Sequence, residues 1–163
     1  MEPQQQDEPS RRPEHQLSLL FDIMVISDRA GELLNRGLKG TGLRAIEYGI
    51  YSILRRQGST TPSLIARLIG MPPSTLSSYL NVMVSRGHAH RVTNTLDGRS
   101  SLIALTAAGV DTHERARLKV AEVHRTLAQH LRRPPDEFRE TLANLAASLQ
   151  DALDDRGNPR SIQ

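Results

Sequence analysis

Start and stop signals for two short helices, in the middle of the chain, constrain the fold more than any other sequence feature. Thr61-Pro62 opens the first helix, because a threonine hydroxyl can accept a hydrogen bond from a free amide and proline at the first helical position needs no donor. Gly70 ends that helix, and the second is predicted to run from Pro72-Pro73 to just before Gly87. Two helices joined by a short glycine-containing turn form the helix-turn-helix pattern.

A β-hairpin is predicted directly after these helices. Asp97-Gly98 is a strong turn signal, since glycine adopts positive φ without strain and aspartate can bond its own backbone. Short runs suited to strands lie on either side, at residues 91–93 and 102–105. Arg99 follows the turn, where a bare hairpin does not need an arginine.

Helical periodicity flanks this central segment on both sides. Further helices are expected over about 14–38 and 43–57, from Thr106 to Pro134-Pro135, and from there to Gly157. The predicted fold is mainly α with a small β-hairpin. The proposed division is a tail at 1–13, an N-terminal dimerisation helix at 14–42, a central lobe at 43–106, C-terminal dimerisation helices at 107–155 and a tail at 156–163.

Composition excludes several classes of function. The chain has no cysteine, so a disulfide framework and regulation by thiol oxidation are ruled out. It has three tyrosines, two phenylalanines and no tryptophan, which argues against aromatic platforms for single-stranded nucleic acid. Pro13 and Asp22 interrupt a superficial likeness to an export signal, and no apolar stretch is long enough to span a bilayer. The sequence therefore predicts a cytoplasmic protein.

Basic charge is concentrated in the middle third of the chain. Residues 51–106 contain six arginines and one aspartate, a net charge of +5, whereas the remainder has 15 basic and 17 acidic residues. Such a segment is typical of a surface that faces an anion such as DNA.

The second short helix carries an uncharged polar stripe. Ser74, Ser78, Asn81 and Ser85 recur at helical spacing, with Ser77 beside them. The opposite, inner face is predicted to consist of Leu76, Leu80, Met83 and Val84. Ordinary solvated faces are rich in Lys and Glu, and this one has neither. Small hydrogen-bonding side chains suit a helix that enters the major groove, where Ser meets base edges or phosphates and Asn can pair with adenine.

The run IARLIGMPPSTLSSYLNVMVSRG, the D-x-R hairpin and LTAAG together resemble the MarR (multiple antibiotic resistance regulator) family of winged helix-turn-helix regulators. The resemblance implies that the hairpin is a wing whose Arg99 enters the minor groove, with Asp97 holding that arginine in place. A narrow minor groove attracts arginine electrostatically. The candidate DNA-binding residues are Thr61, Pro73, Ser74, Thr75, Ser77, Ser78, Asn81, Arg91 and Arg99.

Two positions depart from the family pattern. Many relatives have an arginine where Ser78 stands, so one phosphate or guanine contact is absent here. Pro72, followed by Pro73, replaces the usual Ser or Thr at the start of the helix. This removes a side-chain cap and two amide donors.

Apolar stripes on the first and the last two helices predict either a dimer or a closed single-chain bundle. We favour the dimer, because the central lobe is too small to cover these stripes, and the resemblance implies one built from the same helices. A two-fold dimer would suit a palindromic DNA site with half-sites about one helical turn apart. The candidate interface residues are Leu17, Leu20, Phe21, Val123, Leu127, Phe138, Leu142, Leu145 and Leu149.

No cofactor or metal is predicted. The histidines are scattered, and His88, His90 and His113 lack the spacing and supporting carboxylates of a zinc site; His88 and His90 are instead candidates for phosphate contact or mild pH sensitivity. Through the resemblance, the expected effector is a small lipophilic or phenolic molecule, bound in the crevice between the dimer helices and the DNA lobe.

Two other readings compete with DNA binding. An enzyme is not expected, because the sequence has no phosphate-binding loop, nucleophile elbow or metal motif. A winged-helix protein–protein interaction module is the stronger alternative, although such a module would expose apolar anchors where the serine stripe lies. We therefore predict a homodimeric regulator that binds double-stranded DNA. We expect a ligand-released repressor of bacterial type, associated with the nucleoid when bound.

Overall fold

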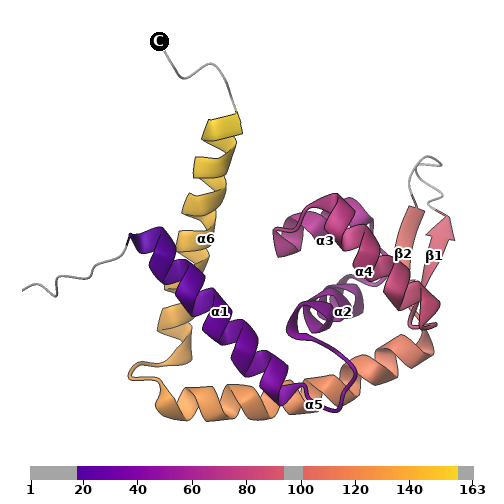
Figure 1. The fold of residues 1–163 in the computed structure, drawn as a ribbon, viewed down its shortest axis with the longest axis horizontal. Helices are drawn as coiled ribbons and strands as arrows, with labels where there is room; N and C mark the ends of the chain where they lie inside the picture. Colours follow the sequence, from indigo (N-terminus) through magenta and orange to yellow (C-terminus); the bar gives the residue numbers. More distant parts are fainter. Residues whose placement is uncertain (1–17, 94–100, 158–163) are drawn as a thin grey trace, which may run out of the picture.

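The computed structural model describes residues 18–93 and 101–157, which form six helices and one antiparallel hairpin. The elements in chain order are α1 (Leu19–Gly37), α2 (Ala45–Gln57), α3 (Pro62–Ile69), α4 (Pro73–Ser85), β1 (Ala89–Thr93), β2 (Ser101–Leu105), α5 (Ala107–His130) and α6 (Pro135–Gly157) (Figure 1). The predicted mainly α fold with a small hairpin is confirmed.

The ends of α3 and α4 lie where the local signals predicted them, whereas α1 begins at Leu19 and α5 ends at His130, short of the expected limits near 14 and 134. The Thr61 hydroxyl accepts a hydrogen bond from the amide of Leu64 at 3.3 Å, which caps α3. Gly70 adopts a left-handed conformation, with φ of 70°, and ends the helix, because a residue without Cβ takes this conformation at little cost. Pro72 stands at the N-cap of α4 and provides no side-chain hydrogen bond.

Helices α2, α3 and α4 and the hairpin form one lobe, and the core of the chain lies mainly inside it. The side chains of Ile50, Ile65, Leu76 and Ile103 are fully or almost fully buried. Leu80 and Met83 join Leu76 on the inner face of α4, as predicted. Val84 was also expected there, but the structure shows it exposed. It lies one residue past Met83, which rotates it away from the core.

The hairpin is attached to the lobe by a contact that local sequence signals did not indicate. Arg91 pairs with Ile103 in the antiparallel register of β1 and β2. Ile103 also exchanges two backbone hydrogen bonds with Thr60, at 2.8 and 3.1 Å. The segment before α3 therefore adds a third, one-residue strand, which fixes the base of the hairpin.

The LTAAG segment forms the junction between the lobe and α5. The Thr106 hydroxyl accepts from the amide of Gly109 at 3.1 Å and donates to the carbonyl of Gly87 at 2.7 Å. A Cβ on Gly109 would lie 2.0 Å from the carbonyl oxygen of His88. Threonine and glycine are thus required here by the close approach of α5 to the start of β1.

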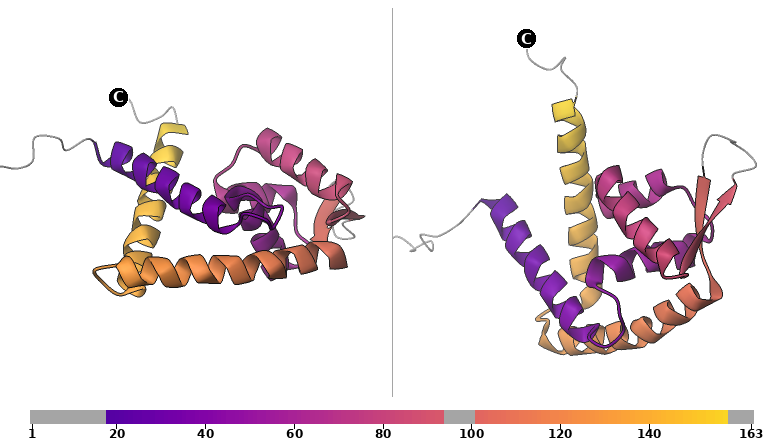
Figure 2. Two further views of the ribbon diagram at one scale, coloured as in Figure 1. Left: turned by 60° about the horizontal axis from the view of Figure 1, so that its bottom comes forward. Right: turned by 45° about the vertical axis from the view of Figure 1, so that its right-hand side comes forward.

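Three helices extend outside the lobe, and we call α1, the second half of α5 and α6 the arms. Helix α5 packs against α2 and α1, and Figure 2 shows α1 and α6 pointing away from it separately. Ser18 caps α1, so the described helix starts at Leu19. The arms do not close into a single-chain bundle within the described residues. None of the described helices has the length and apolar character needed to cross a membrane.

Candidate nucleic-acid interface

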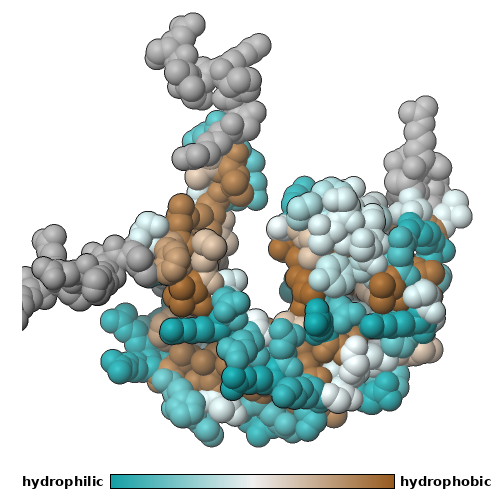
Figure 3. All heavy atoms as spheres, viewed as in Figure 1, coloured by the Kyte–Doolittle hydropathy of each residue, from teal (hydrophilic) through white to brown (hydrophobic). Residues whose placement is uncertain are grey.

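The outer side of α4 presents the predicted polar stripe to solvent. Its exposed residues are Pro73, Ser74, Thr75, Ser77, Ser78, Asn81 and Ser85. Leu76, Leu80 and Met83 anchor the opposite side in the core, so the rotation of the helix is fixed by packing. The surface over α3 and α4 is pale in Figure 3, between the hydrophobic and strongly hydrophilic extremes. This surface has small hydrogen-bonding groups that could approach base edges closely.

Among the candidate DNA-binding residues and the α4 stripe, Thr61 and Ser85 are the two whose hydroxyls already make hydrogen bonds within the chain. Thr61 is half-buried, and its hydroxyl already caps α3. The Ser85 hydroxyl donates to the carbonyl of Val82 at 2.9 Å. Such local hydrogen bonds stabilise helix ends: Thr61 serves the start of α3, and Ser85 the end of α4.

Arg91 joins the hairpin to α4. Its Nη2 donates to Asn81 Oδ1 at 3.2 Å, and its Nη1 donates to Ser101 Oγ at 3.4 Å. Arg91 and Asn81 were both candidates for DNA contact, and the structure brings them together. Residues 94–100, including Asp97 and Arg99, lie outside the described residues, so their roles remain predictions.

The basic charge of the middle segment is partly neutralised by carboxylates from elsewhere. Arg86 Nη1 donates to Glu47 Oε1 at 2.9 Å, and Arg55 lies 3.7 Å from Glu114. The segment therefore offers less free positive charge than its composition suggested. Arg56, Arg67 and Arg91 are exposed and have no acidic partner among residues 18–93 and 101–157.

Glu47 is a buried carboxylate whose role the sequence analysis missed. Besides Arg86, it accepts a hydrogen bond from the amide of Arg44 at 2.9 Å. A glutamate at the third helical position that accepts from the backbone amide of the N-cap residue is half of a capping box. The spacing of Arg44 and Glu47 could have indicated it. Glu47 thus stabilises the start of α2 and holds the end of α4 at the same time.

His88 is half-buried and its ring contacts Tyr51 of the core. Its Nδ1 lies 2.7 Å from the hydroxyl of Tyr51, with which it shares a hydrogen bond. Burial raises the pKa of Tyr51. His90 is exposed and pairs with Ala104, on the face of the hairpin that points away from buried Ile103. Of the two, only His90 is free to meet a phosphate.

His113 joins α5 to α2 in a second buried polar cluster. Its Nε2 lies 3.0 Å from Ser52 Oγ, and its ring stacks on Tyr48 with centroids 5.2 Å apart. Within residues 18–93 and 101–157 its buried Nδ1 has no hydrogen-bond partner, although Oε1 of Glu114 lies 3.7 Å away. Burial is the main cause that lowers the pKa of His113. No three His, Cys, Asp or Glu side chains in the described parts of the chain are arranged to hold a metal ion.

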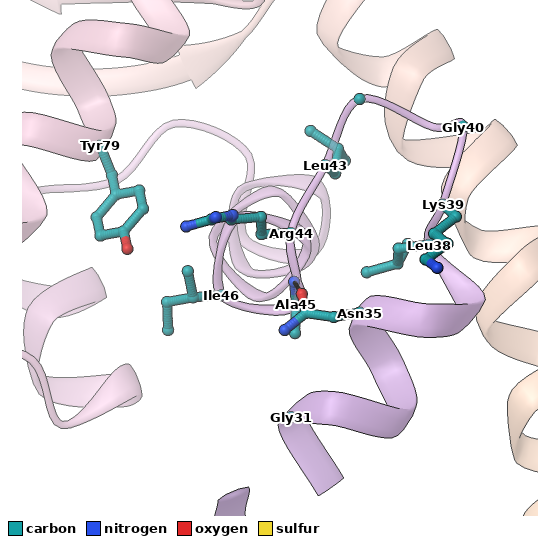
Figure 4. A pocket seen from close by; sticks show the side chains of 11 residues that line it. Gly31, Asn35, Leu38, Lys39, Gly40, Leu43, Arg44, Ala45, Ile46 and Tyr79 are labelled. Atoms are coloured by element: carbon teal, nitrogen blue, oxygen red, sulfur yellow. Dashed lines mark hydrogen bonds between the residues drawn. The ribbon is translucent and has the colours of Figure 1, made fainter. Parts of the chain in front are cut away.

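A crevice of about 900 Å³ lies where α1 meets the lobe (Figure 4). Its walls come from the end of α1, the loop to α2, the start of α2 and Tyr79 of α4. Arg44 extends across it toward Tyr79, and Ile46 lies beside them (Figure 4). A basic group between apolar walls could bind an aromatic or lipophilic molecule that carries a negative group.

The arms expose much of their apolar surface. Met24 and Leu142 are 67% and 57% exposed, and brown side chains follow α1 and α6 in Figure 3. Among the candidate interface residues, Leu20, Phe21, Leu127, Phe138 and Leu142 are exposed, and Leu145 and Leu149 are half-buried. Val123 is half-buried close to Gly37 of its own chain, where a Cβ would lie 2.1 Å from Val123 Cγ2. Leu17 lies outside the described residues.

Comparison with known proteins supports this picture of the lobe. A family model described as winged helix-turn-helix DNA-binding matches residues 43–87, which span α2 to α4. A search of curated proteins finds no match.

Several solved structures share the fold over most of their length. A MarR mutant from E. coli complexed with operator DNA is 25% identical, with a TM-score of 0.67 over 83% of this chain and 93% of that one. The M. tuberculosis regulator MosR in complex with DNA is 21% identical, with a TM-score of 0.74 over 83% and 98%. PcaV from Streptomyces coelicolor, in complex with its natural ligand, is 20% identical, with a TM-score of 0.68 over 83% and 93%.

The match over α2 to α4, the hairpin that follows and these likenesses over the whole architecture agree with one another. MosR and PcaV are both described as transcriptional regulators. The chain therefore contains a winged helix-turn-helix DNA-binding domain over residues 43–87, and its fold is similar to that of the E. coli MarR mutant complexed with operator DNA.

Proposed function

We propose that the protein is a repressor that binds a palindromic operator as a homodimer and is released by a small lipophilic or phenolic effector. The observation that carries this proposal is the uncharged stripe of α4, exposed beside Arg91 of the hairpin. Apolar anchors, which a protein–protein interaction module would need, are absent from the described part of this stripe. Within the chain, we assign DNA binding to residues 43–106 and dimerisation to 14–42 and 107–155.

The contacts to DNA divide into two kinds. Ser74, Ser77, Ser78 and Asn81 occupy the side of α4 that would enter the major groove, with Pro73 and Thr75 at its start, and Arg99 would reach the minor groove under the control of Asp97. Thr61 lies at the N-terminus of α3, where it would approach the phosphate backbone. Phosphate contacts position a protein on DNA, whereas contacts to base edges specify the sequence.

The exposed arms support a dimer. On α6, Leu142 and Leu153 are mostly exposed among the described residues, and Leu145 and Leu149, at helical spacing between them, are half-buried. Contiguous apolar surface of this kind marks an interaction site. A second copy would cover it with the same residues, because a two-fold interface is self-complementary. The two lobes would then face half-sites about one helical turn apart.

The crevice between α1 and the lobe is the proposed effector site. It is bounded by the end of an arm and by Tyr79 on α4, so a molecule bound there would contact both parts. A ligand shifts a conformational equilibrium by its difference in affinity for the two states. An effector that binds more tightly to a dimer whose two lobes do not match the spacing of the half-sites would therefore release the operator.

Binding to a pool of random duplexes at two salt concentrations, followed by sequencing of the bound fraction, tests the proposal. We expect a steep salt dependence and an enriched palindrome. Arg99→Ala should weaken binding to every duplex and reduce the salt slope by about one. Arg132→Ala, which removes the same charge between α5 and α6, is the matched control. Flat, weak binding of the parent with and without candidate phenolic ligands would favour the protein–protein interaction module instead.

A further inference from the structure

We infer that Arg91 is a positioning residue for Asn81: it orients the side-chain amide with which Asn81 reads one base pair in each half-site. This inference rests on the proposed function, since it assumes that α4 enters the major groove. It adds that the base preference at this position depends on the hairpin as well as on α4.

The register of the hairpin directs Arg91 toward α4. Arg91 is the cross-strand partner of Ile103, which is completely buried. Cross-strand partners lie on the same face of a hairpin, so Arg91 emerges on the face that packs against the lobe. Its guanidinium then reaches Asn81 Oδ1 at 3.2 Å and Ser101 Oγ at 3.4 Å.

This contact decides which way the amide of Asn81 faces. The oxygen and nitrogen of an asparagine side chain are nearly equal in shape, and a free amide can present either. A guanidinium has only donors, so it must face the oxygen. Oδ1 is therefore turned toward Arg91 and keeps one free lone pair, whereas Nδ2 offers both of its hydrogens elsewhere.

An amide held in one orientation presents a fixed pattern of one donor and one acceptor. Adenine offers the complementary pattern in the major groove through its N7 and N6 atoms. Without Arg91, the amide could turn over and meet other bases with a single hydrogen bond. The arginine would thereby sharpen a preference for adenine without touching the base.

Arg91 binds an uncharged side chain, whereas Arg86 of the same lobe binds a carboxylate. Glu47 neutralises Arg86, whereas Asn81 binds Arg91 and leaves its charge intact. Arg91 can therefore attract the phosphate backbone while it orients the amide. Removal of Arg91 should therefore lower the affinity for every duplex and, separately, weaken the base preference of Asn81.

The test is selection from random duplexes, with sequencing, for the parent, Asn81→Ala, Arg91→Ala and the double variant. Asn81→Ala should abolish the preference at one base pair of each half-site. Arg91→Ala should reduce the preference at that same base pair about tenfold, within the range of a bidentate contact. The double variant should lose no further preference there. Circular dichroism confirms that each variant is folded.

Two further variants separate positioning from charge. Arg67→Ala removes an exposed arginine of α3 and should weaken binding without changing the preference at that base pair. Asn81→Asp keeps an acceptor for Arg91 but removes the donors, and should shift the preference toward cytosine, whose N4 donates. Retention of the parent preference in Asn81→Asp would contradict the inference.

Other outcomes would overturn the inference in distinguishable ways. A uniform loss of affinity in Arg91→Ala, with every base preference kept, would show a phosphate contact only. An unchanged preference in Asn81→Ala would show that Asn81 does not read a base, although an enriched operator would still support the proposed function. Absence of any enriched operator for the parent would overturn the proposed function itself.

Discussion

The lobe and the arms use their apolar residues in opposite ways. In the lobe, Ile50 and Ile103 are completely buried, and α2, α3, α4 and the hairpin enclose them from several sides. In the arms, Met24 and Leu142 keep more than half of their surface exposed. The lobe encloses its own hydrophobic core, whereas the apolar faces of the arms are left largely uncovered by the described residues.

This difference separates two sources of stability. The lobe is stabilised by contacts within one chain, so substitutions in it should change folding at any protein concentration. The arms gain their stability from association, so their contribution should depend on concentration. The following predictions test that separation, from the largest expected effect to the smallest.

Leu142→Glu should have the largest effect, because it places a charge in the proposed dimer interface. We expect a monomer in sedimentation and a loss of operator affinity of about 10² to 10⁴, the range that bivalent binding supplies. Ala147→Glu introduces the same charge on the opposite side of α6 and should leave a dimer. A dimeric Leu142→Glu variant with parental affinity would contradict the proposed interface.

Gly109→Ala should lower the free energy of unfolding of the lobe by about 3 kcal/mol, as overpacking against rigid atoms does. Its Cβ would lie 2.0 Å from the carbonyl oxygen of His88, a backbone atom that cannot rotate away. Denaturant unfolding at several protein concentrations measures the change.

Gly49→Ala is the matched control for Gly109→Ala. Gly49 lies inside α2, and a Cβ there would meet nothing within 4 Å. The variant should be about 1 kcal/mol more stable, because alanine favours the helix. Equal effects of the two substitutions would show that the junction between β1 and α5 is looser than described.

Arg86→Ala should cost about 2 kcal/mol of unfolding free energy, because it leaves the buried carboxylate of Glu47 without its charged partner. Arg36→Ala removes an arginine from an exposed pair with Glu32 on α1 and should cost less than about 0.5 kcal/mol. Thermal unfolding of both variants measures the difference. Equal costs would mean that the pair in the lobe is as solvated as the pair in the arm.

The smallest expected effect is a pH dependence that originates at His113. Its pKa is lowered in the folded protein by burial, so the unfolded chain binds a proton at a higher pH than the folded one. The stability from this residue is therefore present above its unfolded pKa of about 6.5 and is lost as the pH falls below it.

Melting temperatures from pH 7.5 to 5.5 test this prediction. The parent should lose more stability over this range than His113→Gln, which cannot take up the proton. His124→Gln is the control, because His124 is exposed on the same helix. An identical slope in the parent and His113→Gln would contradict the assignment.

Much of the secondary structure could be predicted because its signals are local. Thr61, Gly70 and Thr106 act within three or four residues of their own positions, and the predicted boundaries were confirmed there. The wrong placement of Val84 shows the limit of periodicity, since a helical stripe does not define how wide the buried face is. That width depends on the shape of the neighbouring elements.

The candidate site was predictable in part for the same reason. The stripe of α4 follows from spacing on one helix, so Ser74, Ser78 and Asn81 could be grouped without a structure. The contact between Asn81 and Arg91 could not, because it depends on how the hairpin crosses α4. The charge of the middle segment was overestimated, because Glu47 and Glu114 come from outside it.

The sequence by itself determined the order of the helices, the limits of α3 and α4, the position of the hairpin and the polar face of α4, because these depend on hydrogen bonds and periodicity within a few residues. The tertiary structure alone decided which charges are neutralised, where the crevice lies, how Asn81 is oriented and which apolar surfaces stay uncovered. Each of these depends on contacts between segments that are distant in the chain, and such contacts exist only once the elements have packed together.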